Sequence, residues 1–145
     1  MTDAWARSIS PADAAVALRS YPRRWRALLA RAEDEDQPEG VLRREPPDGG
    51  PSVLGHLGAT VGALTEAGGD LRVEGAPGDD VDALDRVATA LAAAVDGVDA
   101  DAWARPTSGG GTLLDVVRRA VVAGSEHLRD AERTFDQVVG RPAGA

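Results

Sequence analysis

Apolar residues recur at intervals of three and four along four stretches of this chain, which is the spacing of a helix with one buried face. The stretches predict helices over Pro11–Ala32, Ser52–Ala67, Asp80–Asp96 and Thr112–Val139. The only alternation typical of a strand is too short and isolated to imply a sheet. We therefore expect an all-α fold, an antiparallel four-helix bundle, formed as a single domain over residues 1–145.

Prolines and glycines predict where the helices are interrupted or joined. Pro22 lies inside the first stretch and predicts a kink or a short break. Gly68-Gly69 predicts the end of the second helix. Segment 38–51 carries four prolines and three glycines and is predicted to be a connecting loop.

The predicted core is built mainly from Leu, Val and Ala, because the chain has only three Trp, one Tyr and one Phe. Small aliphatic side chains suit closely packed helices. The helical spacing predicts that the following residues are buried: Trp25, Leu57, Leu91, Val121 and Leu128.

The acidic composition bears on partners and location. A net charge of −8 argues against a nucleic-acid partner, which would require a basic face. Five arginines of the first helix form a local exception, and we interpret them as a solvated face that answers the acidic run at 33–36: Arg19, Arg23, Arg24, Arg26 and Arg31. No apolar run is long enough to span a membrane, and the first residues lack the pattern of a signal peptide, so we expect a cytoplasmic protein with no membrane partner.

Several catalytic classes lack the residues they require. The chain has no cysteine, and all sixteen of its basic side chains are arginines, which excludes a thiol nucleophile, a Schiff-base lysine and the lysine of a phosphate loop. The run Gly109–Gly111 is followed by no GK[ST] motif, so we interpret it as a flexible connection. The serines lack the context of a nucleophile elbow, and no carboxylate pair is singled out.

His56 and His127 are the only histidines, and each lies beside the apolar stripe of a predicted helix. Taken alone, either fits the role of a partly buried structural residue. Taken together, they can reach the bundle interior from facing helices, which is how metal sites are built in helical bundles.

Four short segments resemble the DinB-like superfamily, which includes the N-terminal domains of mycothiol-dependent maleylpyruvate isomerases and the bacillithiol transferases. The segments are VLGHL at 53–57, DAWAR at 101–105, TLLDVV at 112–117 and EHL at 126–128. Their order and spacing extend the resemblance over essentially the whole chain.

The resemblance implies a divalent metal, Zn²⁺ or Ni²⁺, held by one histidine of the second helix and a pair of ligands on the last. His56 matches the first ligand and His127 the final one, but the middle position is Ala123, which cannot coordinate a metal. Two carboxylates are candidate substitutes: Glu126, which is offset around the helix from His127, and Asp130, which lies one turn further along. Either requires a shifted geometry. A catalytic zinc site normally uses three protein ligands and a water.

Two functions follow. The favoured one is a helical bundle with a degenerate metal site, which keeps the fold and binds a small ligand or a partner without catalysis. The alternative is a metal-dependent S-transferase or isomerase that uses a small thiol of the mycothiol type, supplied as cosubstrate. The resemblance also implies a homodimer.

Overall fold

The computed structural model describes Trp5, residues 8–75 and residues 77–140, and every regular element in this part of the chain is helical. The only strand-like feature described is an isolated bridge between Pro106 and Thr112. The elements are α2 (Pro11–Ala32), α3 (Pro38–Arg43), α4 (Val53–Asp70), α5 (Val81–Asp96), the 3₁₀ helix η1 (Ala100–Ala104) and α6 (Leu113–Val138). The expected all-α class is confirmed.

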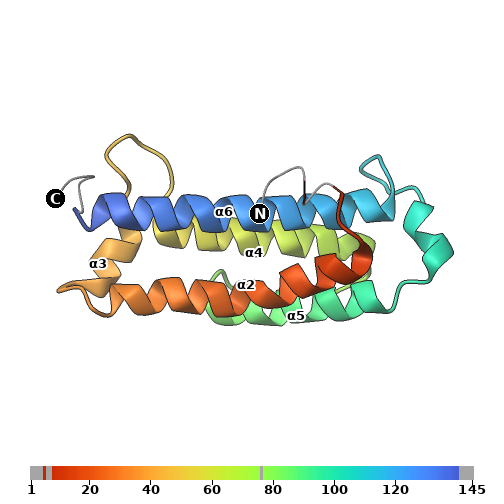
Figure 1. Cartoon of the computed structure of the whole chain (residues 1–145), viewed down its shortest axis with the longest axis horizontal. Helices are drawn as coiled ribbons and strands as arrows, with labels where there is room; N and C mark the ends of the chain where they lie inside the picture. The colour runs from red at the N-terminus through yellow and green to blue at the C-terminus, as the bar shows by residue number, and fades with distance from the viewer. Residues whose placement is uncertain (1–4, 6–7, 76, 141–145) are drawn as a thin grey trace.

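The four long helices lie side by side along one axis (Figure 1), with α2 packed mainly on α5 and α4 mainly on α6. An ion pair from Arg19 to Asp96 joins the first half of α2 to the end of α5, and one from Arg26 to Asp85 joins the second half of α2 to the start of α5. These two helices are therefore antiparallel.

The direction of α6 follows from its contacts with α2. Tyr21 meets Val121, and further along Arg31 meets Asp136, so α2 and α6 run in the same direction. Figure 1 shows that α4 and α5 also run in the same direction, opposite to the other two. The expected bundle of antiparallel helices is therefore correct for the two main pairs and wrong for α4 beside α5 and α2 beside α6.

A long return loop makes the parallel arrangement of α4 and α5 possible. After α4 the chain runs back along that helix, so that Val73 lies against Gly68, Gly75 against Thr65 and Asp79 against Gly58. The loop thus brings the start of α5 back beside the first half of α4. Helix α5 then repeats the direction of α4 instead of reversing it.

Helices α2, α5 and α6 begin and end within one residue of their predicted limits. A polar side chain caps the N-terminus of each helix by accepting a backbone N–H: Ser10 from Asp13, Asp80 from Ala83, and Thr112 from Asp115. The Asp115 carboxylate in turn accepts the backbone N–H of Thr112, which completes a capping box. Helix α2 is continuous through Pro22, so of the kink or short break expected there, the break is not found.

The predicted loop over 38–51 is wrong in its first half, which forms α3. Pro38 occupies the first turn of this helix, where a missing N–H costs nothing, and Val41 anchors the helix with 6 % of its surface exposed. The connection between α5 and α6 contains η1, which lies ahead of the run Gly109–Gly111. Gly68-Gly69 does not end α4, which continues to Asp70.

The core prediction is confirmed, because the five residues singled out are each at most 1 % exposed: Trp25, Leu57, Leu91, Val121 and Leu128. The arginines of α2 are partly as interpreted: the side chains of Arg19, Arg26 and Arg31 are solvated, but their partners differ from those expected. Arg19, Arg26 and Arg31 pair with carboxylates of α5 and α6 and not with the acidic run that follows α2. None of the described helices is both long and apolar enough to cross a membrane.

Candidate functional site: the histidine pair and the seam between α4 and α6

His56 and His127 meet across the contact between α4 and α6. Their Nδ1 atoms are 3.2 Å apart and their ring centroids 5.5 Å apart. His56 is fixed in the first turn of α4, where its backbone N–H donates to the carbonyl oxygen of Ser52, the residue that caps this helix. The approach of the two imidazoles expected from helical phase is confirmed. As neutral rings they form one hydrogen bond, in which one Nδ1–H donates to the other Nδ1.

The surroundings of His56 disfavour its charged form. The side chain is 7 % exposed, and this burial is the main cause that lowers its pKa below the ordinary value. The nearby His127 and Arg133 lower the pKa further, whereas Asp130 opposes them. His56 also lies at the N-terminus of a helix, where a positive charge is unfavourable. The His56 imidazole is therefore neutral near neutral pH.

Two facing imidazole nitrogens 3.2 Å apart are compatible with two bonds to one metal ion, since zinc–nitrogen bonds are about 2.0–2.1 Å long. A third ligand is missing. Across the described part of the chain, no three His, Cys, Asp or Glu side chains come together in a group that could hold a metal ion. The residues present do not fit a three-ligand catalytic site.

Ala123, the position of the missing third ligand, and Glu126, one of its candidate substitutes, line hollows that neither histidine lines. Ala123 is half-buried and lines a hollow between α4 and α6 that neither histidine lines. Glu126 lines a second hollow on the outer flank of α6, together with Arg118 and Ala123, again without either histidine. Glu126 is thus not grouped with the pair in a way that completes a ligand set.

The hollow between α4 and α6, which we call the seam hollow, has a volume of about 360 Å³. Small apolar side chains from both helices form much of its wall, and three charged side chains stand around them. Its lining consists of Ala63, Glu66, Ala67 and Asp70 of α4, Gly109 of the preceding loop, and Val116, Arg119, Ala120 and Ala123 of α6. The second hollow, which we call the flank hollow, has about 500 Å³ and shares Arg119 and Ala123 with the first.

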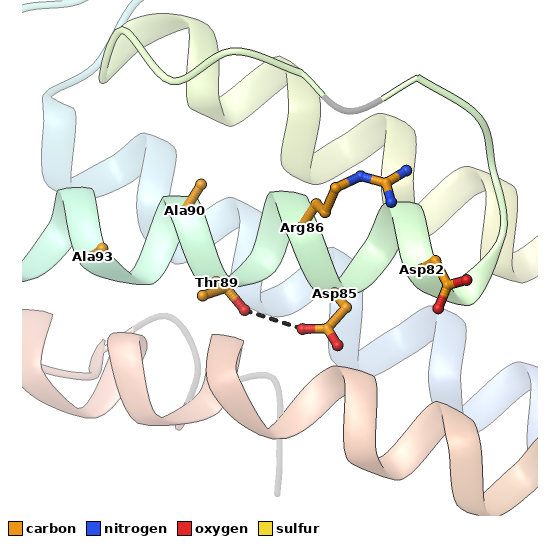
Figure 2. A pocket seen from close by; sticks show the side chains of 6 residues that line it. All are labelled: Asp82, Asp85, Arg86, Thr89, Ala90 and Ala93. Atoms are coloured by element: carbon orange, nitrogen blue, oxygen red, sulfur yellow. Dashed lines mark hydrogen bonds between the residues drawn. The ribbon is translucent and has the colours of Figure 1, made fainter.

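A third hollow, of about 510 Å³, lies on α5 and is less suited to chemistry. Figure 2 shows that its labelled side chains all come from this one helix and spread around it instead of converging. Asp85 there accepts hydrogen bonds from Arg26 and Thr89, and the Arg26 contact is the main cause that lowers its pKa. Its carboxylate is therefore already satisfied.

The sequence did not single out the seam hollow. Its alanines fit the apolar stripes of two predicted helices, and its charged residues stand at the edges of those stripes. The signal available was the run of small residues on both helices, Ala63 and Ala67 facing Ala120 and Ala123.

Comparisons with known family profiles, with curated proteins and with solved structures find no match to this chain.

Proposed function

We propose that this chain is a DinB-like helical bundle with a degenerate metal site, which binds a small ligand or a partner and does not catalyse a metal-dependent reaction. One observation carries the proposal. Two histidines face each other at the spacing of metal ligands, yet no third ligand is grouped with them in the described part of the chain. A pair retained without its third partner is typical of a site that has lost its metal chemistry.

The test uses untagged protein, because an affinity tag binds the same metals. We expect the purified chain to contain far less than one Zn²⁺ or Ni²⁺ per molecule. Restoring the missing ligand with Ala123→His places two histidines four residues apart on α6, on one side of the helix. Calorimetric titration with Zn²⁺ should then show an affinity gain of at least about tenfold.

The matched control is Ala90→His, which adds a histidine at an exposed position of α5 away from the pair. It should leave zinc affinity within about twofold of the original. Equal gains in both variants, or no gain in Ala123→His, would overturn the idea that the pair is the remnant of a metal site.

The competing proposal, a metal-dependent S-transferase or isomerase for a small thiol, draws on the Nδ1–Nδ1 distance of 3.2 Å. It requires about one metal ion per chain in protein as isolated and a loss of that metal in His56→Gln. Stoichiometric metal would therefore favour this alternative over the degenerate site.

The resemblance also motivates a homodimer. A single chain has a mass of 15.0 kDa, so light scattering at micromolar concentration distinguishes the two states directly. A mass near that of one chain would contradict the dimer.

A further inference from the structure

The seam hollow holds opposite charges that do not pair with one another. Arg119 stands on α6, while Glu66 and Asp70 stand on the facing side of α4 and line the same hollow. No ion pair joins these described side chains. The one hydrogen bond of the Arg119 guanidinium goes to the carbonyl of Gly110 at 3.5 Å, at the limit of a useful contact.

Other arginines of this bundle do close ion pairs across a helix contact. Arg19, Arg26 and Arg31 each reach a carboxylate on a neighbouring helix. The hollow therefore keeps a donor fork on one wall and two acceptors on the other, with space between them.

The wall between these charges is apolar. Ala63 and Ala67 of α4 face Ala120 and Ala123 of α6, and their small side chains leave the space that larger residues would fill. A volume of about 360 Å³ falls within the range of small-molecule sites, and the flank hollow continues it past Arg119. A short aliphatic body fits such a wall.

We propose that the seam hollow binds a small zwitterion of the α-amino-acid type, with its carboxylate on Arg119, its ammonium toward Glu66 and Asp70, and its aliphatic side chain over the alanines. Arginine presents a planar fork that matches a carboxylate. The two acidic residues favour a cation opposite it, so neither a simple anion nor a simple cation satisfies both walls. This inference deepens the proposed function, since it rests on the binding of a small ligand and supplies its chemical class and place.

The experiment titrates the full chain with leucine and follows amide signals by nuclear magnetic resonance, after metal has been removed with a chelator and the chelator dialysed away. Metal removal makes the result independent of the histidine pair. Leucine should shift signals of α4 and α6 around the seam hollow in a saturable manner. N-acetylleucine, which lacks the ammonium, and leucine methyl ester, which lacks the carboxylate, should each bind at least about tenfold more weakly.

The variant Arg119→Gln should weaken leucine binding at least about tenfold, since it replaces a charge-assisted contact by a neutral one. Arg119 is exposed, so this change is not expected to disturb folding, and a thermal melt checks that it does not. The matched control is Arg86→Gln, at an exposed arginine of α5, which should bind leucine like the original chain.

Three outcomes would overturn the inference: no saturable shifts with leucine, equal binding of N-acetylleucine, or equal losses in Arg119→Gln and Arg86→Gln. None of them bears on the histidine pair. A failure here with a zinc gain in Ala123→His would leave the degenerate metal site in place and remove only this ligand. The reverse result would keep the zwitterion site and remove the metal ancestry.

Discussion

Tyr21 joins α2 to α6 through a contact that only a glycine permits. Its hydroxyl donates to the Val121 carbonyl at 2.8 Å and lies 2.9 Å from the Ser125 hydroxyl. Burial raises the pKa of Tyr21, and the hydrogen bond with Ser125 only partly opposes it, so the phenol remains a neutral donor. The ring rests on Gly124, where an added Cβ would lie 2.5 Å from the ring carbon Cε2.

We therefore expect Gly124→Ala to lower the free energy of unfolding by about 1–3 kcal/mol, the usual cost of overpacking a core. The higher helix propensity of alanine, worth about 1 kcal/mol, would offset only part of the clash. The matched control is Gly62→Ala on α4, which is exposed and has nothing within 4 Å of the new Cβ. It should raise stability by about 0.5–1 kcal/mol. Urea unfolding measures both, and equal effects of the two changes would contradict the close packing of Tyr21.

His56 makes stability depend on pH in a definite direction. Its pKa in the folded chain is lowered, chiefly by burial, whereas in the unfolded chain it titrates near its ordinary value of about 6.5. Between the two values the unfolded chain binds more protons. The free energy of unfolding should therefore fall as the pH drops below about 6.5, by at most about 1.4 kcal/mol per pH unit for one proton.

Urea unfolding between about pH 5 and 7.5 measures this dependence, and His56→Gln should make the profile flatter because the group is removed. Carboxylates titrate in both proteins and cancel in the comparison. Identical slopes in the variant and the original chain would show that folding does not lower the pKa of His56.

At the scale of elements, the end of α4 shows why Gly68-Gly69 does not mark where this helix ends. Val73 donates its N–H to the Gly68 carbonyl at 2.8 Å and Arg72 donates to Gly69, the two bonds of a Schellman motif. The residue in the left-handed conformation is Arg72, with φ at 59°. Gly68 instead gives room to Val73, whose Cβ would lie 3.2 Å from an added Cβ. Gly68 thus serves packing, whereas an added Cβ at Gly69 would meet nothing within 4 Å.

This geometry predicts that Arg72→Gly stabilises the chain. A left-handed conformation costs a residue with a Cβ about 1–2 kcal/mol, and glycine removes this cost. Glycine also has more conformational freedom in the unfolded chain, which cancels about half of the stabilisation. The net rise in unfolding free energy should be about 0.5–1 kcal/mol. The same substitution at Arg23, exposed within α2, should instead cost about 1 kcal/mol. Changes of the same sign at both positions would contradict the strain at Arg72.

Local signals were sufficient where a cap and an apolar stripe agreed. Asp80 and Thr112 mark the starts of α5 and α6 because their side chains accept the first free N–H groups. Local signals fail for α3, because proline is typical of loops but is also accepted in the first turn of a helix, where Pro38 lies. A single buried residue, Val41, is too little periodicity to predict a helix of this length.

At the scale of the whole molecule, helix direction could not be predicted from the sequence. Whether α5 repeats or reverses the direction of α4 depends on the loop that folds back along Gly68 and Gly58, and no periodicity reports it. The meeting of His56 and His127 was predictable because each has a fixed phase on its own helix. The seam hollow was not, because its alanines also fit an ordinary core and its opening depends on how closely α4 and α6 approach.

The net charge of −8 gives the last prediction, at neutral pH. Attraction and repulsion compete in this molecule. The ion pairs between helices are solvent-exposed, with 41 % or more of each side chain accessible, so each contributes little to stability. Excess negative charge repels itself over the whole surface and destabilises the compact state.

Sodium chloride weakens both effects, because it screens charges beyond a Debye length of about 10 Å at 0.1 M. If self-repulsion dominates, as we expect at this net charge, the midpoint of thermal unfolding at neutral pH should rise as salt increases to about 0.5 M. The control is the same titration near the isoelectric point of about 4.7, where net repulsion vanishes and only attractive pairs remain to be screened. There the midpoint should stay level or fall with salt. A fall at neutral pH would mean instead that the pairs made by Arg19, Arg26 and Arg31 hold α2 against its neighbours more strongly than exposed pairs usually do.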